Sequence, residues 1–360
     1  MKVFVLCEAY PSENNYYAMS FVHPRVKRYM DAGLLVEVIS FSTKENYVFD
    51  RVQVLNKYTG EKRIRNSNQE IVLISHAPNL KHHLIFLFRN WKFFDKITFF
   101  FHGHETLKIA DYYPVPYKYC IVEKKYRRKL LLYDIIKIPL LRYFLRLILK
   151  RKDVKLVYVS KWMYHSALKS LGINTIDLSE KVVIINNTIS EYIEKTHYSF
   201  NNYRADFITI RPLDQSKYAI DLVVDFAKNH PNNTFHIYGK GMYFQYNSLP
   251  SNVEIYDTFF DAKDIPELLN SYKYAIMPTR LDAQGVMVCE MAEYGIPVLT
   301  SDLPICHEML DGYENVVFLD NLHFDLDVSQ IPSPNKKMKN KFSFNNTVMQ
   351  EINLIKTLIK

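Results

Sequence analysis

Glycine is scarce in this chain, which has 9 glycines among its 360 residues, whereas about 7% is usual. Neither G-x-G-x-x-G nor G-x-x-x-x-G-K-[ST] occurs anywhere in the sequence. These two patterns mark the commonest loops that bind nucleotide phosphates in α/β proteins. The sequence therefore excludes the usual dinucleotide-binding and P-loop classes.

Paired cysteines and long apolar runs are also missing. Cys7, Cys120, Cys289 and Cys306 lie far apart and form no C-x-x-C pair, so we expect no zinc site and a reduced, cytoplasmic setting. No stretch approaches the 18 or so apolar residues of a membrane-spanning helix. The first apolar run stops at Glu8, too early for a signal peptide. We expect a protein that neither spans a membrane nor is exported.

The remaining composition is that of a globular protein large enough for two domains. Apolar residues make up 48% and charged residues 23%, which excludes a disordered or fibrous chain. Short apolar runs alternate with helix-length segments in both halves of the sequence. The expected strands are 3–7, 35–41, 71–75, 97–101, 156–159, 182–185, 207–210, 234–238, 253–256, 274–277 and 298–300. Such nearly continuous apolar strands predict parallel sheets covered on both faces.

The two sets of strands predict two doubly wound, Rossmann-like domains of the α/β class. The sequence between them, near residues 190–205, is polar and poor in large aliphatic residues, as in an exposed hinge. We expect domains at 1–195 and 196–340, followed by a C-terminal helix within 341–360 that could pack back on the first domain. Open parallel sheets bind ligands beyond the carboxyl ends of their strands. A cleft between the domains is therefore the expected site.

Positive charge is concentrated in residues 118–152, which contain twelve Lys or Arg against Glu123 and Asp134. The formal net charge of the whole chain is +8, so the rest of the chain is close to neutral. Helical spacing gives this segment two unlike sides. One side carries Leu141, Phe144, Leu145 and Ile148, and the other carries Arg142, Arg146 and Lys150. The pattern predicts a basic amphipathic helix.

Three interpretations of this helix are open. It could attach to an anionic membrane surface, where each basic residue contributes about 1 kcal/mol and the apolar stripe adds to the binding. It could instead be a surface helix whose apolar stripe packs on its own domain. Nucleic acid ranks last, because no zinc finger, ribonucleoprotein motif or heptad accompanies the charge. We favour the membrane surface.

Residues 278–302 form the most informative stretch of the sequence. A strand ends near Pro278, a loop follows, a helix begins around Gly285, and a Gly-Ile-Pro turn leads to the next strand. The helix N-terminus therefore lies at the carboxyl edge of a sheet, where exposed N–H groups and the positive end of the helix dipole suit a phosphate. Asp282 and Glu290 place two carboxylates across this turn. They could bind the hydroxyls of a sugar and of a ribose.

Two cations, Arg211 and Lys217, follow an earlier strand of the same sheet. Facing a helix N-terminus, they could hold a diphosphate and stabilise it as a leaving group without a metal. Each residue taken alone is more simply explained as a solvated loop charge. Their order along one sheet, with the cations first and the carboxylates after, favours a shared site.

These segments resemble a known family. Residues 282–302 resemble the E-x7-E region of retaining GT-B glycosyltransferases, family 4 in particular, with Asp282 in place of the first Glu and Glu290 as the second. Arg211 and Lys217 are similar to the diphosphate-binding pair of that family. The run 101–105, with His102, is similar to its strand-end His motif, and 159–163 to its VS-x-W/M segment.

The resemblance implies a GT-B fold, in which two Rossmann-like domains face each other across a cleft, and a retaining, metal-independent transfer of a sugar. His102, Asp282, Arg211 and Lys217 would form the catalytic set. The donor, expected to be a UDP-sugar, would be bound mainly by the second domain. Its ligands would be Arg211, Lys217, Asp282, Gly285, Val286, Met287, Val288 and Glu290. The family needs no resident cofactor and no metal.

We expect an enzyme of surface polysaccharide or capsule biosynthesis, with a glycan or polyprenyl-linked acceptor. The basic segment 118–152 would hold it on the inner face of the cell membrane. Two other functions remain open. One is a catalytically silent GT-B subunit that positions a partner enzyme. The other is a nucleotide-sugar epimerase, which would turn over donor without any glycan and would have no use for a basic amphipathic helix.

Overall fold

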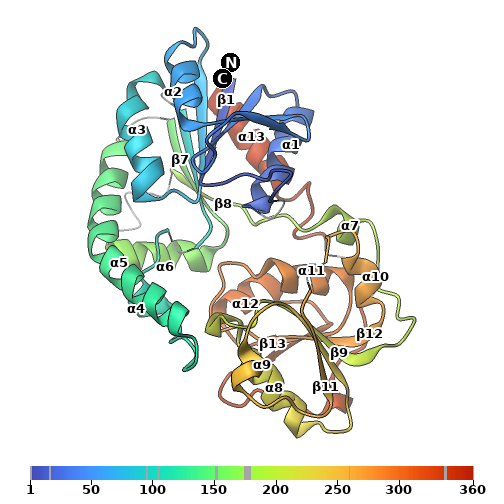
Figure 1. The fold of residues 1–360 in the computed structure, drawn as a ribbon. Helices are drawn as coiled ribbons and strands as arrows, with labels where there is room; N and C mark the ends of the chain where they lie inside the picture. Colours follow the sequence, from blue (N-terminus) through green and yellow to red (C-terminus); the bar gives the residue numbers. More distant parts are fainter. Residues whose placement is uncertain are drawn as a thin grey trace. The chain divides into compact units, whose positions relative to one another are not determined.

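The computed structural model describes residues 2–15, 18–94, 96–103, 105–150, 153–173, 180–258, 260–335 and 339–359. Two sheets organise the chain, and helices flank the strands of each (Figure 1). Contacts divide it into two compact units. Unit 1 comprises 1–108, 133–186 and 347–360, and unit 2 comprises 109–132 and 187–346. Each unit is described by itself below.

The sheet of unit 1 has the strand order β3-β4-β2-β1-β5-β6-β7-β8. Every neighbouring pair is parallel except β3 and β4, which form an antiparallel hairpin. The strands are β1 (Lys2–Cys7), β2 (Val36–Ser40), β3 (Tyr47–Phe49), β4 (Val52–Leu55), β5 (Ile71–His76), β6 (Lys96–Phe101), β7 (Asp153–Tyr158) and β8 (Val182–Ile184). The central strands β1, β5 and β6 are almost wholly buried, because helices cover both faces of a parallel sheet.

The sheet of unit 2 is parallel throughout, in the order β11-β10-β9-β12-β13-β14. Its strands are β9 (Ala205–Ile210), β10 (Phe235–Tyr238), β11 (Val253–Tyr256), β12 (Tyr272–Met277), β13 (Val298–Ser301) and β14 (Val316–Leu319). This is the order of a doubly wound Rossmann sheet, whose ligand site lies where the chain direction reverses, between β9 and β12. The predicted class of two doubly wound domains is confirmed.

Helices connect the strands, and α6 has a well-defined cap at each end. They are α1 (His23–Asp31), α2 (Lys57–Arg65), α3 (Ile85–Asn90), α4 (Ile109–Tyr112), α5 (Ile121–Ile148), α6 (Lys161–Leu171), α7 (Glu191–Glu194), α8 (Ile220–Asn229), α9 (Tyr243–Tyr246), α10 (Ile265–Leu269), α11 (Val286–Tyr294), α12 (Pro304–Leu310) and α13 (Val348–Ile359). The Ser160 side chain caps α6 by accepting from the Met163 N–H, and left-handed Gly172 ends that helix.

The helix α13 belongs to unit 1, although it follows unit 2 in the chain. It lies beside α1 (Figure 1). Glu351 on α13 is fully buried, and its carboxylate accepts hydrogen bonds from Arg25 Nε at 3.0 Å and from the Tyr29 hydroxyl at 2.5 Å. A buried carboxylate is tolerated only with such partners, so these bonds specify where α13 docks.

The helix α5 runs through both units, with its first twelve residues in unit 2 and the rest in unit 1. The apolar stripe at 141, 144, 145 and 148 is 1–5% exposed and packs inside unit 1. The second interpretation is therefore correct for these four side chains, and they are not available to a membrane. None of the helices that the structure describes is long and apolar enough to cross a membrane.

Candidate active site

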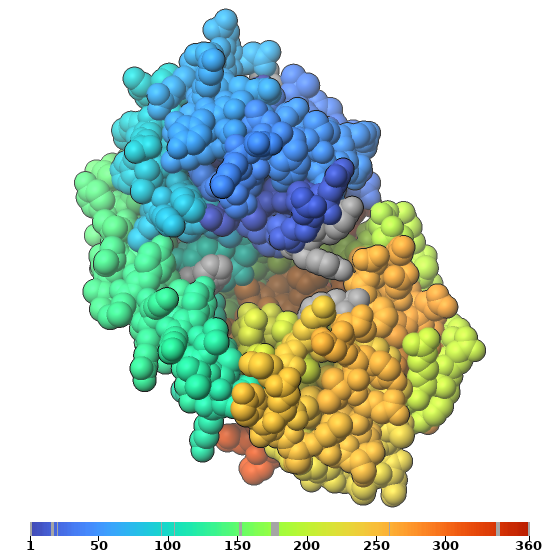
Figure 2. Space-filling view, in the orientation of Figure 1, coloured from blue at the N-terminus to red at the C-terminus, as the bar shows by residue number. Residues whose placement is uncertain are grey.

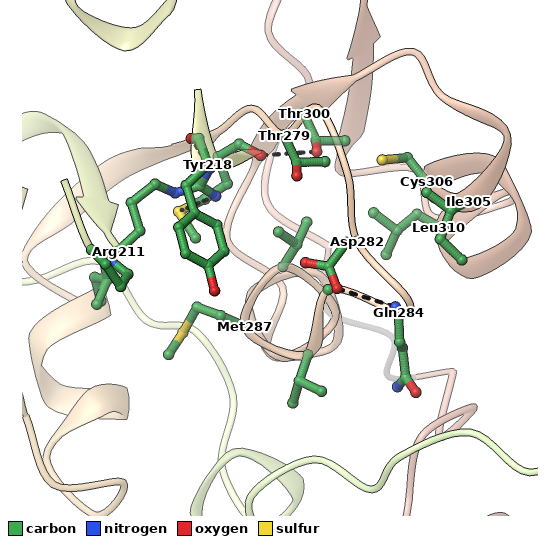
Figure 3. Close-up of a pocket in the computed structure, with 16 residues that line it drawn as sticks. Arg211, Tyr218, Thr279, Asp282, Gln284, Met287, Thr300, Ile305, Cys306 and Leu310 are labelled. Carbon is green, nitrogen blue, oxygen red and sulfur yellow. Dashed lines mark hydrogen bonds between the residues drawn. The ribbon is translucent and has the colours of Figure 1, made fainter. Parts of the chain in front are cut away.

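A cavity of about 390 Å³ opens at the carboxyl ends of the strands of unit 2. It lies between the ends of β9, β12 and β13 and the beginnings of α11 and α12, where a doubly wound sheet is expected to bind its ligand. Figure 3 shows the side chains around it. Its lining is Ile210, Arg211, Pro212, Tyr218, Met277, Thr279, Asp282, Gln284, Gly285, Val286, Met287, Val288, Thr300, Ile305, Cys306 and Leu310. Six of the predicted donor-binding residues are among them.

The loop before α11 presents a carboxylate and free helix N–H groups to this cavity. Asp282 Oδ1 accepts from the N–H groups of Ala283 at 2.8 Å and Gln284 at 3.2 Å, which fixes the loop. Gly285 has φ of +73°, a left-handed conformation that L side chains rarely adopt. The first α11 hydrogen bond is donated by Cys289 to the Gly285 carbonyl. The preceding N–H groups, at 286–288, are therefore left for a ligand.

Arg211 lies at the end of β9 and is 6% exposed. Its Nη1 donates to the carbonyls of Tyr218, at 2.5 Å, and Pro278. Its Nε has no hydrogen-bond partner among the residues that the structure describes. Burial lowers the pKa of the guanidinium to about 10, so it is still charged at neutral pH. In this arrangement Arg211 holds the ends of β9 and β12 together while it lines the cavity.

Lys217 does not line the cavity, but an aromatic ring places its charge near that of Arg211. The Lys217 Nζ lies 4.6 Å from the centroid of the Tyr218 ring, and the Arg211 Cζ lies 5.8 Å from it. Both distances are within the range of cation–π attraction. The sequence analysis did not single out Tyr218. The only sign of Tyr218 in the sequence was that an aromatic residue follows Lys217, a predicted phosphate-binding cation.

Arg280 is a second residue near the cavity that the sequence analysis did not single out. Its guanidinium forms two hydrogen bonds to the Asp221 carboxylate, at 2.8 and 2.6 Å, and its Nη1 also donates to the Ser216 carbonyl. Its backbone N–H donates to the Lys217 carbonyl at 2.7 Å. Arg280 therefore ties the loop after β12, which carries Asp282, to the loop after β9, which carries the two cations.

Gln284 fixes the chain where it enters unit 2. Its Oε1 accepts from the Asn187 N–H at 2.6 Å, and its Nε2 donates to the Asn187 carbonyl at 2.9 Å. The side-chain amide thus pairs with both backbone groups of Asn187, as a neighbouring strand would. The Gln284 side chain also lines the cavity (Figure 3). Nothing in the sequence near Asn187 indicated this pair.

Glu290 lies on the second turn of α11, outside the cavity lining. Its Oε1 accepts from the Ser190 N–H at 2.7 Å. Burial raises the pKa of this carboxyl to about 7, and the hydrogen bond from Ser190 opposes the shift. The Glu290 side chain is partly buried, and a carboxylate with one protein hydrogen bond retains acceptor capacity for a ligand hydroxyl.

His102 belongs to unit 1, in the loop after β6. The Glu105 carboxylate shapes this loop by accepting from the backbone N–H groups of His102, at 3.2 Å, and Gly103, at 2.6 Å. The His102 Nε2 lies 3.2 Å from Nδ1 of the buried His76. Burial and the nearby imidazole lower the pKa of His76 well below its ordinary value, so His76 is neutral. His104 lies outside the described residues.

Cysteine chemistry has no place in this site. All four cysteines are buried and none forms a disulfide. Burial raises the pKa of Cys306, which lines the cavity, to about 12. A thiol needs a lowered pKa to act as a nucleophile, so Cys306 serves as a small apolar side chain.

The comparisons agree with the architecture of unit 2. Residues 208–323 match the family model of glycosyl transferases group 1. This segment contains the whole cavity lining. No curated protein matches the chain in sequence.

Solved structures match the chain over nearly its whole length at low identity. Sucrose-phosphate synthase from Thermosynechococcus elongatus has a TM-score of 0.68 at 10% identity, with 100% of this chain and 99% of that chain covered. The lipopolysaccharide outer core galactosyltransferase WaaB has 0.62 at 12%, with 99% of each chain covered. A mutant of S. aureus TarM in complex with Fondaparinux, alpha-GlcNAc-glycerol and UDP has 0.58 at 11%, with 98% and 93% covered.

These likenesses show that the chain has the GT-B fold, with two parallel-sheet α/β domains. Together with the family match, they support a glycosyltransferase.

Proposed function

We propose that the protein transfers a sugar from a UDP-sugar to a glycan or polyprenyl-linked acceptor, with retention of the anomeric configuration and without a metal ion. One observation carries the proposal. Within the group 1 domain, the exposed N–H groups at the start of α11 and the Asp282 carboxylate line one cavity beside Arg211. Diphosphate and sugar hydroxyls are the ligands that such groups bind.

In the proposed complex the N–H groups at 286–288 and the two cations bind the diphosphate. Their positive charge stabilises the UDP that leaves. Asp282 accepts hydrogen bonds from hydroxyls of the donor sugar, and Glu290 accepts them from the ribose. The bond between the anomeric carbon and the phosphate oxygen breaks while the acceptor oxygen bonds to the same face of the sugar. The departing phosphate oxygen takes the acceptor proton, so no protein base is needed.

His102 is proposed to lie beside the donor sugar and to orient it. Its Nε2 meets a neutral His76, which holds the imidazole through one nitrogen. The Glu105 carboxylate fixes the backbone of the loop that carries it. His102 is therefore a residue whose direction is set by two neighbours before any ligand binds.

We further propose that the acceptor belongs to surface polysaccharide or capsule biosynthesis and that the protein works on the inner face of the cell membrane. A galactosyltransferase of the lipopolysaccharide outer core shares the fold, and the complex of S. aureus TarM contains UDP. Both support the choice of donor and of acceptor class. The concentration of positive charge in 118–152 supports a peripheral membrane location.

Binding of the donor can be tested without knowing the acceptor. A panel of nucleoside diphosphates and nucleotide sugars is added with EDTA present, and thermal unfolding is followed. A ligand at 100 times its Kd stabilises the folded protein by about 2.7 kcal/mol. We expect UDP and one UDP-sugar to stabilise the protein. Asp282→Asn should weaken the stabilisation by the UDP-sugar and leave the stabilisation by UDP in place. The exposed Asp257→Asn is the matched control.

Retention can be tested through slow hydrolysis of the bound donor. NMR of an α-linked UDP-sugar should show the α anomer of the free sugar first, before mutarotation. The β anomer appearing first would refute retention. No stabilisation by any nucleotide would instead favour the silent subunit, and interconversion of the free donor would favour the epimerase.

A further inference from the structure

The outward side of α5 carries an apolar patch between two basic clusters. At 100° per residue, the exposed side chains of this helix other than Tyr126 fall within about 140° of one another. We name this surface the outer face of α5. It consists of Ile121, Lys125, Arg128, Lys129, Leu132, Ile135, Ile136, Leu140, Tyr143 and Arg146. Figure 2 shows this part of the chain, teal to green, at the surface of the molecule.

The centre of the outer face is strongly exposed. Leu132, Ile135, Ile136, Leu140 and Tyr143 are between 50% and 69% exposed. A single exposed apolar side chain is ordinary, whereas a contiguous patch rimmed by polar residues marks an interaction site. These residues lie opposite the buried stripe at 141, 144, 145 and 148. The helix is therefore apolar on both sides, and only the outer one is accessible.

Charge identifies what the outer face fits. Exposed basic residues flank the patch at both ends, with Lys125, Arg128 and Lys129 before it and Arg146 after it. The structure describes every residue of α5, and neither of its two acids is exposed. Asp134 is 11% exposed and pairs with Lys137 at 2.6 Å. A surface with accessible apolar and cationic groups and no accessible anion complements an anionic apolar partner.

We propose that the outer face of α5 docks on an anionic lipid bilayer, with the helix lying in the plane of the interface. The apolar patch would enter the acyl boundary, and the flanking basic side chains would extend to the headgroups. The helix has 28 residues and is therefore about 42 Å long. This proposal rests on the proposed function, which places the enzyme at a membrane, and it adds which surface of the protein contacts the lipid.

The test compares vesicles of phosphatidylglycerol and phosphatidylcholine with vesicles of phosphatidylcholine alone, by sedimentation of the full-length protein. Three substitutions make the patch polar and keep the net charge: Leu132→Gln, Ile136→Gln and Leu140→Gln. The control removes three exposed apolar side chains elsewhere: Tyr58→Gln, Leu249→Gln and Leu322→Gln. We expect the patch variant to lose partitioning to anionic vesicles on the order of 100-fold, and the control to behave as the wild type.

A second pair of variants tests the basic clusters. Arg128→Gln with Lys129→Gln should weaken partitioning to anionic vesicles about 25-fold, since each basic residue contributes about fivefold. The exposed pair Lys44→Gln with Lys62→Gln is the matched control. High salt should weaken the wild type on anionic vesicles by screening and should leave its weak binding to neutral vesicles unchanged.

The outcomes separate the partners. Wild-type protein that stays in the supernatant with anionic vesicles, or a folded patch variant that sediments like the wild type, would overturn the proposal. A lipid-free dimer that the patch substitutions convert to monomer, without vesicle binding, would assign the face to a second copy instead. Stabilisation by UDP, measured on the same variants, is independent of lipid. Loss of sedimentation with intact UDP binding therefore concerns the outer face alone.

Discussion

Replacement of Glu290 by Gln should change how the stability of the protein depends on pH. The folded state raises the pKa of this carboxyl from 4.5 to about 7 because the group is buried. The folded protein therefore holds a proton that the unfolded chain releases between pH 4.5 and 7. The contribution of this carboxyl to the free energy of unfolding is fully present below pH 4.5. It is lost as pH rises through about 7, because ionisation is favoured in the unfolded state.

Gln has nearly the shape of the protonated acid and never ionises, and its Oε1 can still accept from Ser190. At low pH, wild type and Glu290→Gln should have similar free energies of unfolding. At pH 8 the wild type carries a buried charge, and the rise in pKa corresponds to about 3 kcal/mol. Since 1 kcal/mol shifts Tm by about 2–4 °C in domains of 150–250 residues, Glu290→Gln should melt roughly 6–12 °C higher at pH 8.

The assay is thermal or urea unfolding of both proteins at half-unit steps from pH 4.5 to 8, without nucleotide. The exposed Glu314→Gln should give a difference from the wild type that is small and flat over this range. If the difference in stability between Glu290→Gln and the wild type does not change with pH, the pKa of Glu290 is not raised in the folded protein. Nucleotide titrations at pH 8 then test the ribose role separately, since Gln should weaken UDP binding even as it stabilises the fold.

Three further substitutions probe contacts within one unit or the other. Arg280→Lys keeps the charge but loses the forked hydrogen bonds to Asp221. We expect roughly tenfold weaker UDP binding in calorimetric titration, on the order of 1.4 kcal/mol. Unchanged affinity would show that the two loops keep their positions without these bonds. Gln284→Ala removes two hydrogen bonds to the backbone of Asn187 and should cost about 1–3 kcal/mol in urea unfolding. Glu351→Ala removes the carboxylate that neutralises the buried Arg25 and should cost about 3–5 kcal/mol, which an unfolding midpoint equal to that of the wild type would contradict.

Much of the fold could be predicted because parallel strands buried on both faces are continuous apolar runs. All eleven expected strands are present. The strands β3, β4 and β14 were missed. They are three or four residues long, and so short an apolar run does not by itself distinguish a strand from other structure.

Apart from Arg211, the site could be predicted only where its residues are close together in the chain. The loop and helix at 282–290 show a carboxylate, a turn glycine and a helix start in one segment, and the structure places Asp282 and Gly285 in the cavity as expected. Arg280 and Gln284 act on backbone groups about 60 to 100 residues away. Such partners become neighbours only through the sheet order, and no local pattern records them.

The helix α5 shows a different limit. Its period of 3.6 residues is clear in the sequence, but both of its sides are apolar. Helical spacing alone does not tell which apolar side a protein buries. The structure decides it, because the side at 141–148 packs inside unit 1. The favoured interpretation was wrong in assigning this stripe to lipid, because the stripe packs in the core of unit 1.

The docking of α13 on unit 1 has a consequence for how the chain is made and divided. Unit 1 is built from three separate stretches of chain, and its last one follows all of unit 2. During synthesis, Arg25 and Tyr29 must wait for Glu351 until unit 2 has left the ribosome. Neither unit can be released by a single proteolytic cut, and a chain that stops after unit 2 would leave a buried cation of unit 1 without its carboxylate.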